Sequence, residues 1–279
     1  MSITNIKKIL RNEKYELLFL FFFRCMIRSG SELIPISSKG RFCNMMGRSH
    51  LIIGTGVSLS VLQLLGMPVT APAVTAALIG SLLPDIDEPN SLLVSKALPN
   101  SLIRLLQTVL LPAAVFVYFY VPAKPWNLLL AILIGLVSFL PSRSLRKVLM
   151  FAIGLGLVFY GHAFAPWNWI AGSLLMLCTT LTHRGLTHTL YGTAVWAGLL
   201  YSTTQVQGPE IWVAGGSAYA LHLIADSLTN RGIRPLPPFK LRIRANLMST
   251  GTKHGAVVEN VCVVLTLILA WFAFSPLFL

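Results

Sequence analysis

Residues 101–121 read SLIRLLQTVLLPAAVFVYFYV and contain a single charged side chain, that of Arg104. A run of about 20 apolar residues is long enough to cross the hydrocarbon core of a bilayer as a helix. Other long apolar runs recur along the 279-residue chain, in which 55% of the residues are hydrophobic and 11% are charged. Because a soluble domain of this size carries about 25% charged residues, the sequence predicts an all-α, polytopic membrane protein.

The apolar runs predict about nine helical spans, separated by joints that contain proline, glycine or charged residues. We expect these spans near residues 51–66, 69–83, 101–121, 126–140, 146–161, 167–182, 188–204, 211–229 and 257–278. The sequence shows no internal repeat and no low-complexity linker. Residues 45–279 are therefore expected to form one membrane-embedded domain.

Residues 1–44 differ from the remainder of the chain, because basic residues precede a short apolar stretch, ELLFLFFF, that ends at Arg24. This stretch is too short to be assigned as a membrane-spanning helix, and no small-residue cleavage site of a signal peptide follows it. We interpret the extension as an interfacial anchor, or as sequence upstream of a natural start at Met45 or Met46.

The net charge of +13 arises from basic residues that lie mostly in the links between apolar runs. This placement favours contact with anionic lipid headgroups, and no nucleic acid is expected as the principal partner. The basic segments 141–147 and 231–253 mark the cytoplasmic side, whereas the links 162–166 and 205–210 contain no Lys or Arg. The four cysteines form no CxxC pair, which argues against a thiolate metal site or a disulfide framework.

The rare acidic and imidazole side chains gather at one membrane face on this topology. Seven of them are expected at the cytoplasmic face: His50, Asp85, Asp87, His183, His188, His222 and Asp226. Taken singly, they have simpler interpretations, because an aspartate pair can cap a helix and His222 can hydrogen bond to Asp226 on one helix face. Together, imidazole and carboxylate groups are the ligands of zinc and related ions, and their number predicts two or more divalent metals.

Several motifs carry a family resemblance. They are GRSH at 47–50, GSLLPDIDEP at 80–89, HRGLTHT at 183–189, HLIADSLT at 222–229 and GIRPLPP at 232–238. Over about residues 47–265 they resemble the YdjM-type family of inner-membrane, metal-dependent hydrolases. The resemblance implies a helical fold distantly similar to zinc-dependent phospholipase C and single-strand nucleases. It also implies that all seven residues are metal ligands, that zinc is the favoured metal, and that the protein lies in the inner (cytoplasmic) membrane.

The interval between Asp87 and His183 departs from compact members of that family because it is longer and is expected to hold four crossings. An even number of crossings keeps the GSLLPDIDEP motif and the HRGLTHT motif at the same face of the membrane. The extra helices nevertheless weaken any inference about the substrate from the family alone.

The predicted function is metal-assisted hydrolysis of a lipid or membrane-proximal phosphoester, with an anionic phospholipid as a candidate substrate. Asp85 or Asp87 is expected to orient or deprotonate the attacking water, and Arg184 to bind the anionic phosphate or to anchor the chain at the interface. Glu259 is a further candidate for a role next to the metal ligands. The alternatives are a metal-binding transporter and a membrane scaffold in which metal only holds helices together.

The topology yields a test at the C-terminus. Nine crossings place residue 279 on the side opposite to Arg41 and Arg48, which the positive-inside rule assigns to the cytoplasm. A reporter fused after Leu279 should therefore read the periplasmic side. A cytoplasmic reading would mean that the number of crossings is even, or that residues 17–27 also cross the membrane.

Overall fold

The computed structural model describes residues 43–275 except 182–184 and 250–251. These residues contain α-helices, short 3-10 helices and two isolated β-bridges, and a helix lies in each of the nine segments where the sequence predicts one. The all-helical class is thereby confirmed. The described residues form two compact units, the first made of 43–82 with 189–275 and the second of 83–188.

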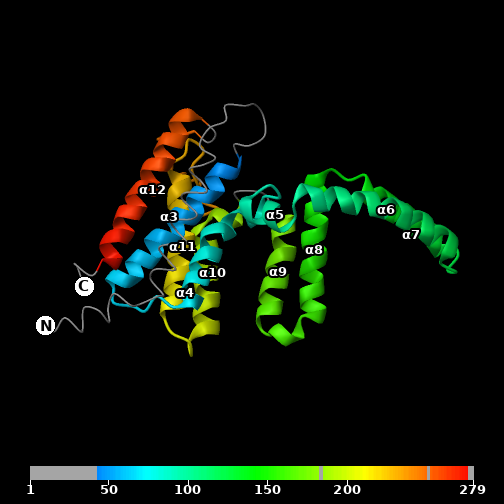
Figure 1. Cartoon of the computed structure of the whole chain (residues 1–279), viewed down its shortest axis with the longest axis horizontal. Coiled ribbons are helices and arrows are strands. Elements are labelled where there is room, and N and C mark those ends of the chain that lie inside the picture. Colours follow the sequence, from blue (N-terminus) through cyan, green and yellow to red (C-terminus); the bar gives the residue numbers. More distant parts are fainter. Residues whose placement is uncertain (1–42, 182–184, 250–251, 276–279) are drawn as a thin grey trace. The chain divides into compact units, whose positions relative to one another are not determined.

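The first unit is a bundle built around one central helix. Its helices are α3 (Cys43–Leu64), α4 (Ala71–Leu82), α10 (Leu190–Thr204), α11 (Glu210–Ser227) and α12 (Lys253–Phe274). Helix α11 packs against α3, α4 and α10, while α12 packs along α3 (Figure 1). Eleven of the 18 residues of α11 are buried, so this helix forms the core of the unit.

Small residues allow α3, α4 and α11 to approach one another closely. A Cβ atom added to Gly80 on α4 would collide with the carbonyl oxygen of Gly215 on α11. One added to Gly54 on α3 would lie 2.7 Å from the Cβ of Ser81. Close backbone approach at small residues is a common way for helices to associate in membranes, where apolar burial adds little. These contacts set the position of Ser81 relative to α11.

The link between α11 and α12 folds back onto the C-terminal end of α11. Ile233 and Ile243 pair in an antiparallel bridge. The amide of Ala245 donates to the carbonyl of Ser227 at 2.8 Å, and that of Leu247 donates to the carbonyl of Leu228 at 3.0 Å. The link is therefore held by main-chain hydrogen bonds next to the turn of α11 that carries Asp226.

The second unit consists of two helical hairpins and the short segments that flank them. Its elements are η1 (Leu83–Asp87), α5 (Leu92–Ala97), α6 (Asn100–Tyr120), α7 (Trp126–Ser138), α8 (Ser142–Tyr160), η2 (His162–Phe164), α9 (Trp167–Thr180) and η3 (Leu186–His188). Helices α8 and α9 lie side by side (Figure 1). Gly154 and Gly172 face each other there, and a Cβ on Gly154 would lie 2.7 Å from the carbonyl oxygen of Gly172.

The hairpin of α6 and α7 exposes a large apolar surface. Phe116, Phe119, Leu129 and Leu133 are each more than half exposed. The side-chain amide of Asn127 on α7 donates to the carbonyl of Tyr118 on α6 at 2.8 Å and so joins the two helices of the hairpin. A contiguous apolar surface of this kind is stable against lipid and would promote aggregation in water.

A buried arginine fixes the loop that follows the two aspartates of η1. Arg146, near the start of α8, is almost fully buried. Its guanidinium donates to the carbonyls of Leu98 at 3.0 Å and Pro89 at 3.1 Å, and to the side-chain oxygens of Asn90 and Asn100, both at 2.8 Å. Because a guanidinium has five donors in a rigid fork, one side chain can hold the loop and the start of α6 together.

Two of the described helices, α6 and α12, are long and apolar enough to cross a membrane, and α7 is a shorter apolar helix. At 1.5 Å per residue, the 12 residues of α4 and the 14 of α9 rise only about 20 Å, less than the roughly 30 Å of a hydrocarbon core. The expected helices are thus present, and a count of nine crossings stays a prediction.

The packing of α4 against α11 yields a matched pair of glycine substitutions. Gly80→Ala places a methyl group against a main-chain carbonyl and should destabilise the protein by about 1–3 kcal/mol. Gly198→Ala on α10 meets no atom within 4 Å and should be neutral or stabilising by up to about 1 kcal/mol. Thermal unfolding in detergent compares the two variants with the parent, and equal transitions would show that α4 and α11 are not in close contact.

Candidate metal centre

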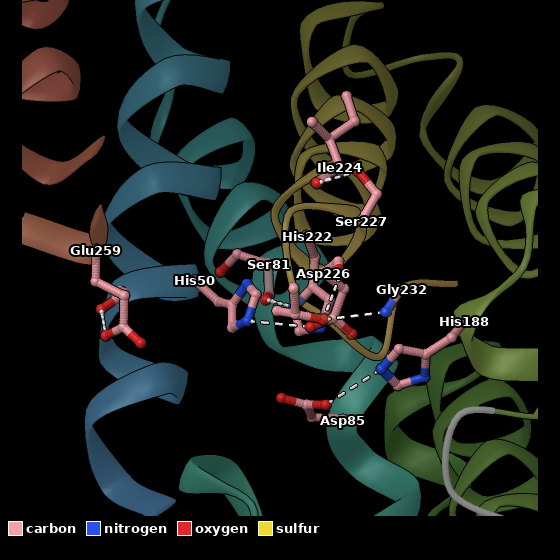
Figure 2. A network of polar contacts seen from close by, with 12 residues as sticks. His50, Ser81, Asp85, His188, His222, Ile224, Asp226, Ser227, Gly232 and Glu259 are labelled. Atoms are coloured by element: carbon pink, nitrogen blue, oxygen red, sulfur yellow. Dashed lines mark hydrogen bonds and ion pairs between the residues drawn. The ribbon is translucent and has the colours of Figure 1, made fainter. Parts of the chain in front are cut away.

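Three predicted ligands come together in the first unit. His50 on α3 and His222 and Asp226 on α11 are 4%, 1% and 2% exposed, respectively. One potential ligand atom from each residue lies within 4.8 Å of the other two. Figure 2 shows the His50 and His222 rings close to the Asp226 carboxylate. The sequence places His50 at the start of a span, whereas the structure places it inside α3, which already begins at Cys43.

The spacing of these groups resembles that of ligands around one ion. His50 Nε2 lies 3.6 Å from Asp226 Oδ1, which is longer than a charge-assisted hydrogen bond of about 2.8 Å. Two ligands on a tetrahedral zinc ion, each at about 2.1 Å, are separated by roughly 3.4 Å. The two imidazole rings stack with their centroids 4.1 Å apart and an interplanar angle of 19°. The three groups are therefore close enough to be candidate ligands of one ion.

A main-chain carbonyl fixes the tautomer of His222. Its Nδ1 lies 2.7 Å from the carbonyl oxygen of Ser81 on α4. Because a carbonyl oxygen only accepts, Nδ1 carries the proton and donates it, and in the neutral ring the lone pair is on Nε2. Metal-binding histidines typically make such a bond with their other ring nitrogen, which orients the ring and makes it a stronger ligand.

A small cavity lies beside His50 in the first unit. It has a volume of about 20 Å³, and its lining includes Ser49, His50, Glu259 and Cys262. The volume is about that of one water molecule, but the atoms that face the cavity are apolar. Glu259, on α12, accepts a hydrogen bond of 2.9 Å from the hydroxyl of Ser49. The sequence names Glu259 as a candidate for a role next to the ligands, and this location is compatible with that role.

The second unit holds a separate cluster of predicted site residues. Segments η1 and η3 contact each other and bring Asp85 and Asp87 close to His188. His188 Nε2 lies 3.3 Å from Asp85 Oδ1, a pair also drawn in Figure 2. His188 and Asp87 are buried, whereas the side chain of Asp85 is 24% exposed. Helix α9 ends at Thr180 and η3 begins at Leu186.

Thr187 connects Asp87 to His188. Its hydroxyl donates to Asp87 Oδ2 at 2.8 Å and lies 3.1 Å from His188 Nδ1. Since the single hydroxyl proton is used on the carboxylate, the oxygen accepts from His188 Nδ1–H. The neutral ring then presents its Nε2 lone pair to the Asp85 carboxylate, an arrangement that a cation between the two would stabilise. Sequence reasoning missed Thr187, although its position next to His188 in HRGLTHT was the available signal.

The family model described as YdjM inner membrane protein matches residues 45–277. The chain belongs to the YdjM inner membrane protein family. It is therefore a membrane protein, and the exposed apolar surface of α6 and α7 is explained by lipid contact. All seven predicted ligands lie within the part of the chain that matches the YdjM family. No curated protein and no protein of solved structure matches the chain significantly.

The structure describes six of the seven predicted ligands and groups them as three in each unit. His183 and Arg184 lie outside the described residues. Two further histidines are not among the predicted ligands: His162 is in η2 beside Trp169, and His254 hydrogen bonds to the Leu247 carbonyl at 3.1 Å. The gathering of all seven residues at one membrane face stays a prediction, as does the similarity to phospholipase C.

The Asp87–Thr187–His188 chain predicts a graded effect at Thr187. Thr187→Val removes the hydroxyl while keeping the shape, so His188 loses the partner that fixes its tautomer. Metal affinity should fall about 10- to 100-fold, as it does when the partner of a ligating histidine is removed. Thr187→Ser keeps the hydroxyl and should retain most of the affinity. Zinc titration of the purified proteins measures both, and equal affinity of the valine variant and the parent would exclude this role.

Proposed function

We propose that this member of the YdjM family is a metal-dependent hydrolase that cleaves a lipid or membrane-proximal phosphoester. The observation that carries the proposal is the buried group of His50, His222 and Asp226, with ligand-like spacing and one imidazole oriented by a main-chain carbonyl. Clustered imidazole and carboxylate groups in a membrane protein are functional candidates, because they are costly to bury without a role.

The donor set fits a divalent cation. As metal ligands, two neutral imidazoles and one carboxylate would carry a formal charge of −1 in a buried region, and a metal ion would compensate it. Nitrogen and oxygen donors of this kind suit zinc and related ions. Such an ion supplies Lewis acidity and lowers the pKa of water to about neutrality when it is bound. Zinc as the metal, and two or more ions, remain part of the proposal.

The remaining residues have distinct proposed roles. Asp85 is the partly exposed carboxylate of the second unit and is assigned the transfer of a proton from water. Asp87 is engaged with Thr187, so in addition to its proposed role as a ligand it orients His188. Arg184 is assigned to the anionic phosphate, as the sequence predicts. Glu259, which accepts a hydrogen bond from Ser49, is a candidate for a role next to the ligands.

Two other functions would use the same ligands. A transporter would require polar groups along a path through the membrane, whereas the sequence assigns the seven residues to one face, which we propose to be cytoplasmic. A scaffold would require metal only for folding. The buried imidazole and carboxylate groups suit all three functions, and the hydrolase is favoured because Asp85 is a partly exposed carboxylate next to a buried histidine.

Asp226→Asn separates metal binding from membrane insertion. The substitution keeps the size of the side chain but removes the charge that would offset a cation, so bound metal and hydrolytic turnover should both be lost. Insertion should persist, because apolar helices drive it and a neutral side chain is cheaper to bury. Elemental analysis of the purified protein and phosphate release from a panel of phospholipids measure the two properties together.

Glu210→Gln is the matched control for this experiment. Glu210 is also a buried carboxylate on α11, but it lies in the first turn of the helix and Asp226 in the last. The control should keep its metal and its turnover. Full occupancy and activity in Asp226→Asn would remove Asp226 from the site. Metal loss without phosphoesterase activity in either protein would favour the scaffold, and metal-dependent flux in proteoliposomes would favour the transporter.

A further inference from the structure

The link between α11 and α12 contains a segment in which basic and apolar residues alternate. Residues 239–244 read FKLRIR, and all six are exposed. The apolar members Phe239, Leu241 and Ile243 are 67%, 54% and 46% exposed, respectively. They alternate with Lys240, Arg242 and Arg244. We call residues 239–244 the alternating segment.

The backbone of the alternating segment has no helical turn and is held in place. Ile243 pairs with Ile233, and the Nε of Arg242 donates to the carbonyl of Arg231 at 2.8 Å. The segment therefore presents three exposed apolar side chains and three exposed cations next to one another, on a backbone that is tied to residues 231 and 233.

No acidic residue accompanies these cations. Between Asp226 and Glu259 the chain contains six basic residues and no Asp or Glu: Arg231, Arg234, Lys240, Arg242, Arg244 and Lys253. A negatively charged partner would balance these cations, and a partner with an apolar phase would also cover the three large apolar side chains that are otherwise left in water.

We propose that the alternating segment binds the membrane surface of the same leaflet and selects anionic phospholipids. Phe239, Leu241 and Ile243 enter the boundary between headgroups and acyl chains, while Lys240, Arg242 and Arg244 contact the lipid phosphates. Interfacial peptides combine the same two elements, a buried apolar side and a basic side attracted to anionic lipid. This binding is a property of the segment alone and does not depend on hydrolysis.

The chemistry favours lipid over other polyanions and over a second copy of the chain. A nucleic acid would neutralise the cations but would leave Phe239, Leu241 and Ile243 exposed, because proteins bind nucleic acids mainly through the phosphate backbone. A second copy carries a net charge of +13 and only nine acidic residues in the whole chain, so it is a poor counterion. A bilayer of the inner membrane, in which the YdjM family resides, supplies both the charge and the apolar phase.

The test uses full-length protein in a neutral detergent with mixed micelles of phosphatidylcholine and phosphatidylglycerol. Bound lipid is extracted after purification and its composition is measured. The parent should be enriched in phosphatidylglycerol. Lys240→Gln with Arg244→Gln should lower the affinity for phosphatidylglycerol about 30-fold, because each cation near an anionic surface contributes about 1 kcal/mol. Arg104→Gln with Lys124→Gln removes the same charge from exposed positions elsewhere and should keep the enrichment.

The parent alone provides a second measurement that requires no variant to fold. Raising the salt concentration to about 1 M shortens the Debye length to about 3 Å and should remove most of the preference for phosphatidylglycerol. Replacing Phe239 and Leu241 by serine should lower total lipid binding while keeping the preference. Equal binding of the two lipids by the parent, or equal losses in the two glutamine variants, would overturn the proposal. Displacement of phosphatidylglycerol by a short RNA at low concentration would also overturn it.

Discussion

The contact between α4 and α11 is the constraint on which the first unit depends. Gly80 and Gly215 let the two backbones approach until the Ser81 carbonyl reaches His222 Nδ1 at 2.7 Å. That single bond selects the tautomer, and the tautomer decides which nitrogen can act as a ligand. In a chain with so few charged groups, geometry at small residues thus determines the chemistry of a buried imidazole.

The helices were predictable because their signals are local, and the partners of the site residues were not. Residues 101–121 predict a span, and α6 occupies Asn100–Tyr120. Helix α3 begins before its predicted span because GRSH adds polar residues to a helix that an apolar pattern does not detect. Helix α5, with only six residues, is too short to give a periodic signal. The bond from His222 to Ser81 joins residues 141 positions apart, and no local pattern encodes it.

The two histidine clusters show two ways of orienting an imidazole in an apolar protein. His222 uses a main-chain carbonyl of a neighbouring helix, whereas His188 uses the hydroxyl of the preceding residue, which is itself held by Asp87. In the second unit, Arg146 holds the loop after Asp87 through neutral oxygens alone, so a permanent charge is buried without an acidic partner among them. Hydrogen bonds that are fully made allow such groups to remain in the interior.

The acceptor of the His222 hydrogen bond is a main-chain oxygen, so substitutions at Ser81 should affect metal retention less than substitutions at the glycines around it. No side-chain replacement at Ser81 can delete that oxygen, so position 81 can tolerate small residues although it supports the candidate ligand. The sensitive positions are instead Gly54, Gly80 and Gly215, which carry no polar side chain. A saturation-mutagenesis map of metal retention would therefore trace a line of intolerant glycines, and a search restricted to polar side chains would overlook it.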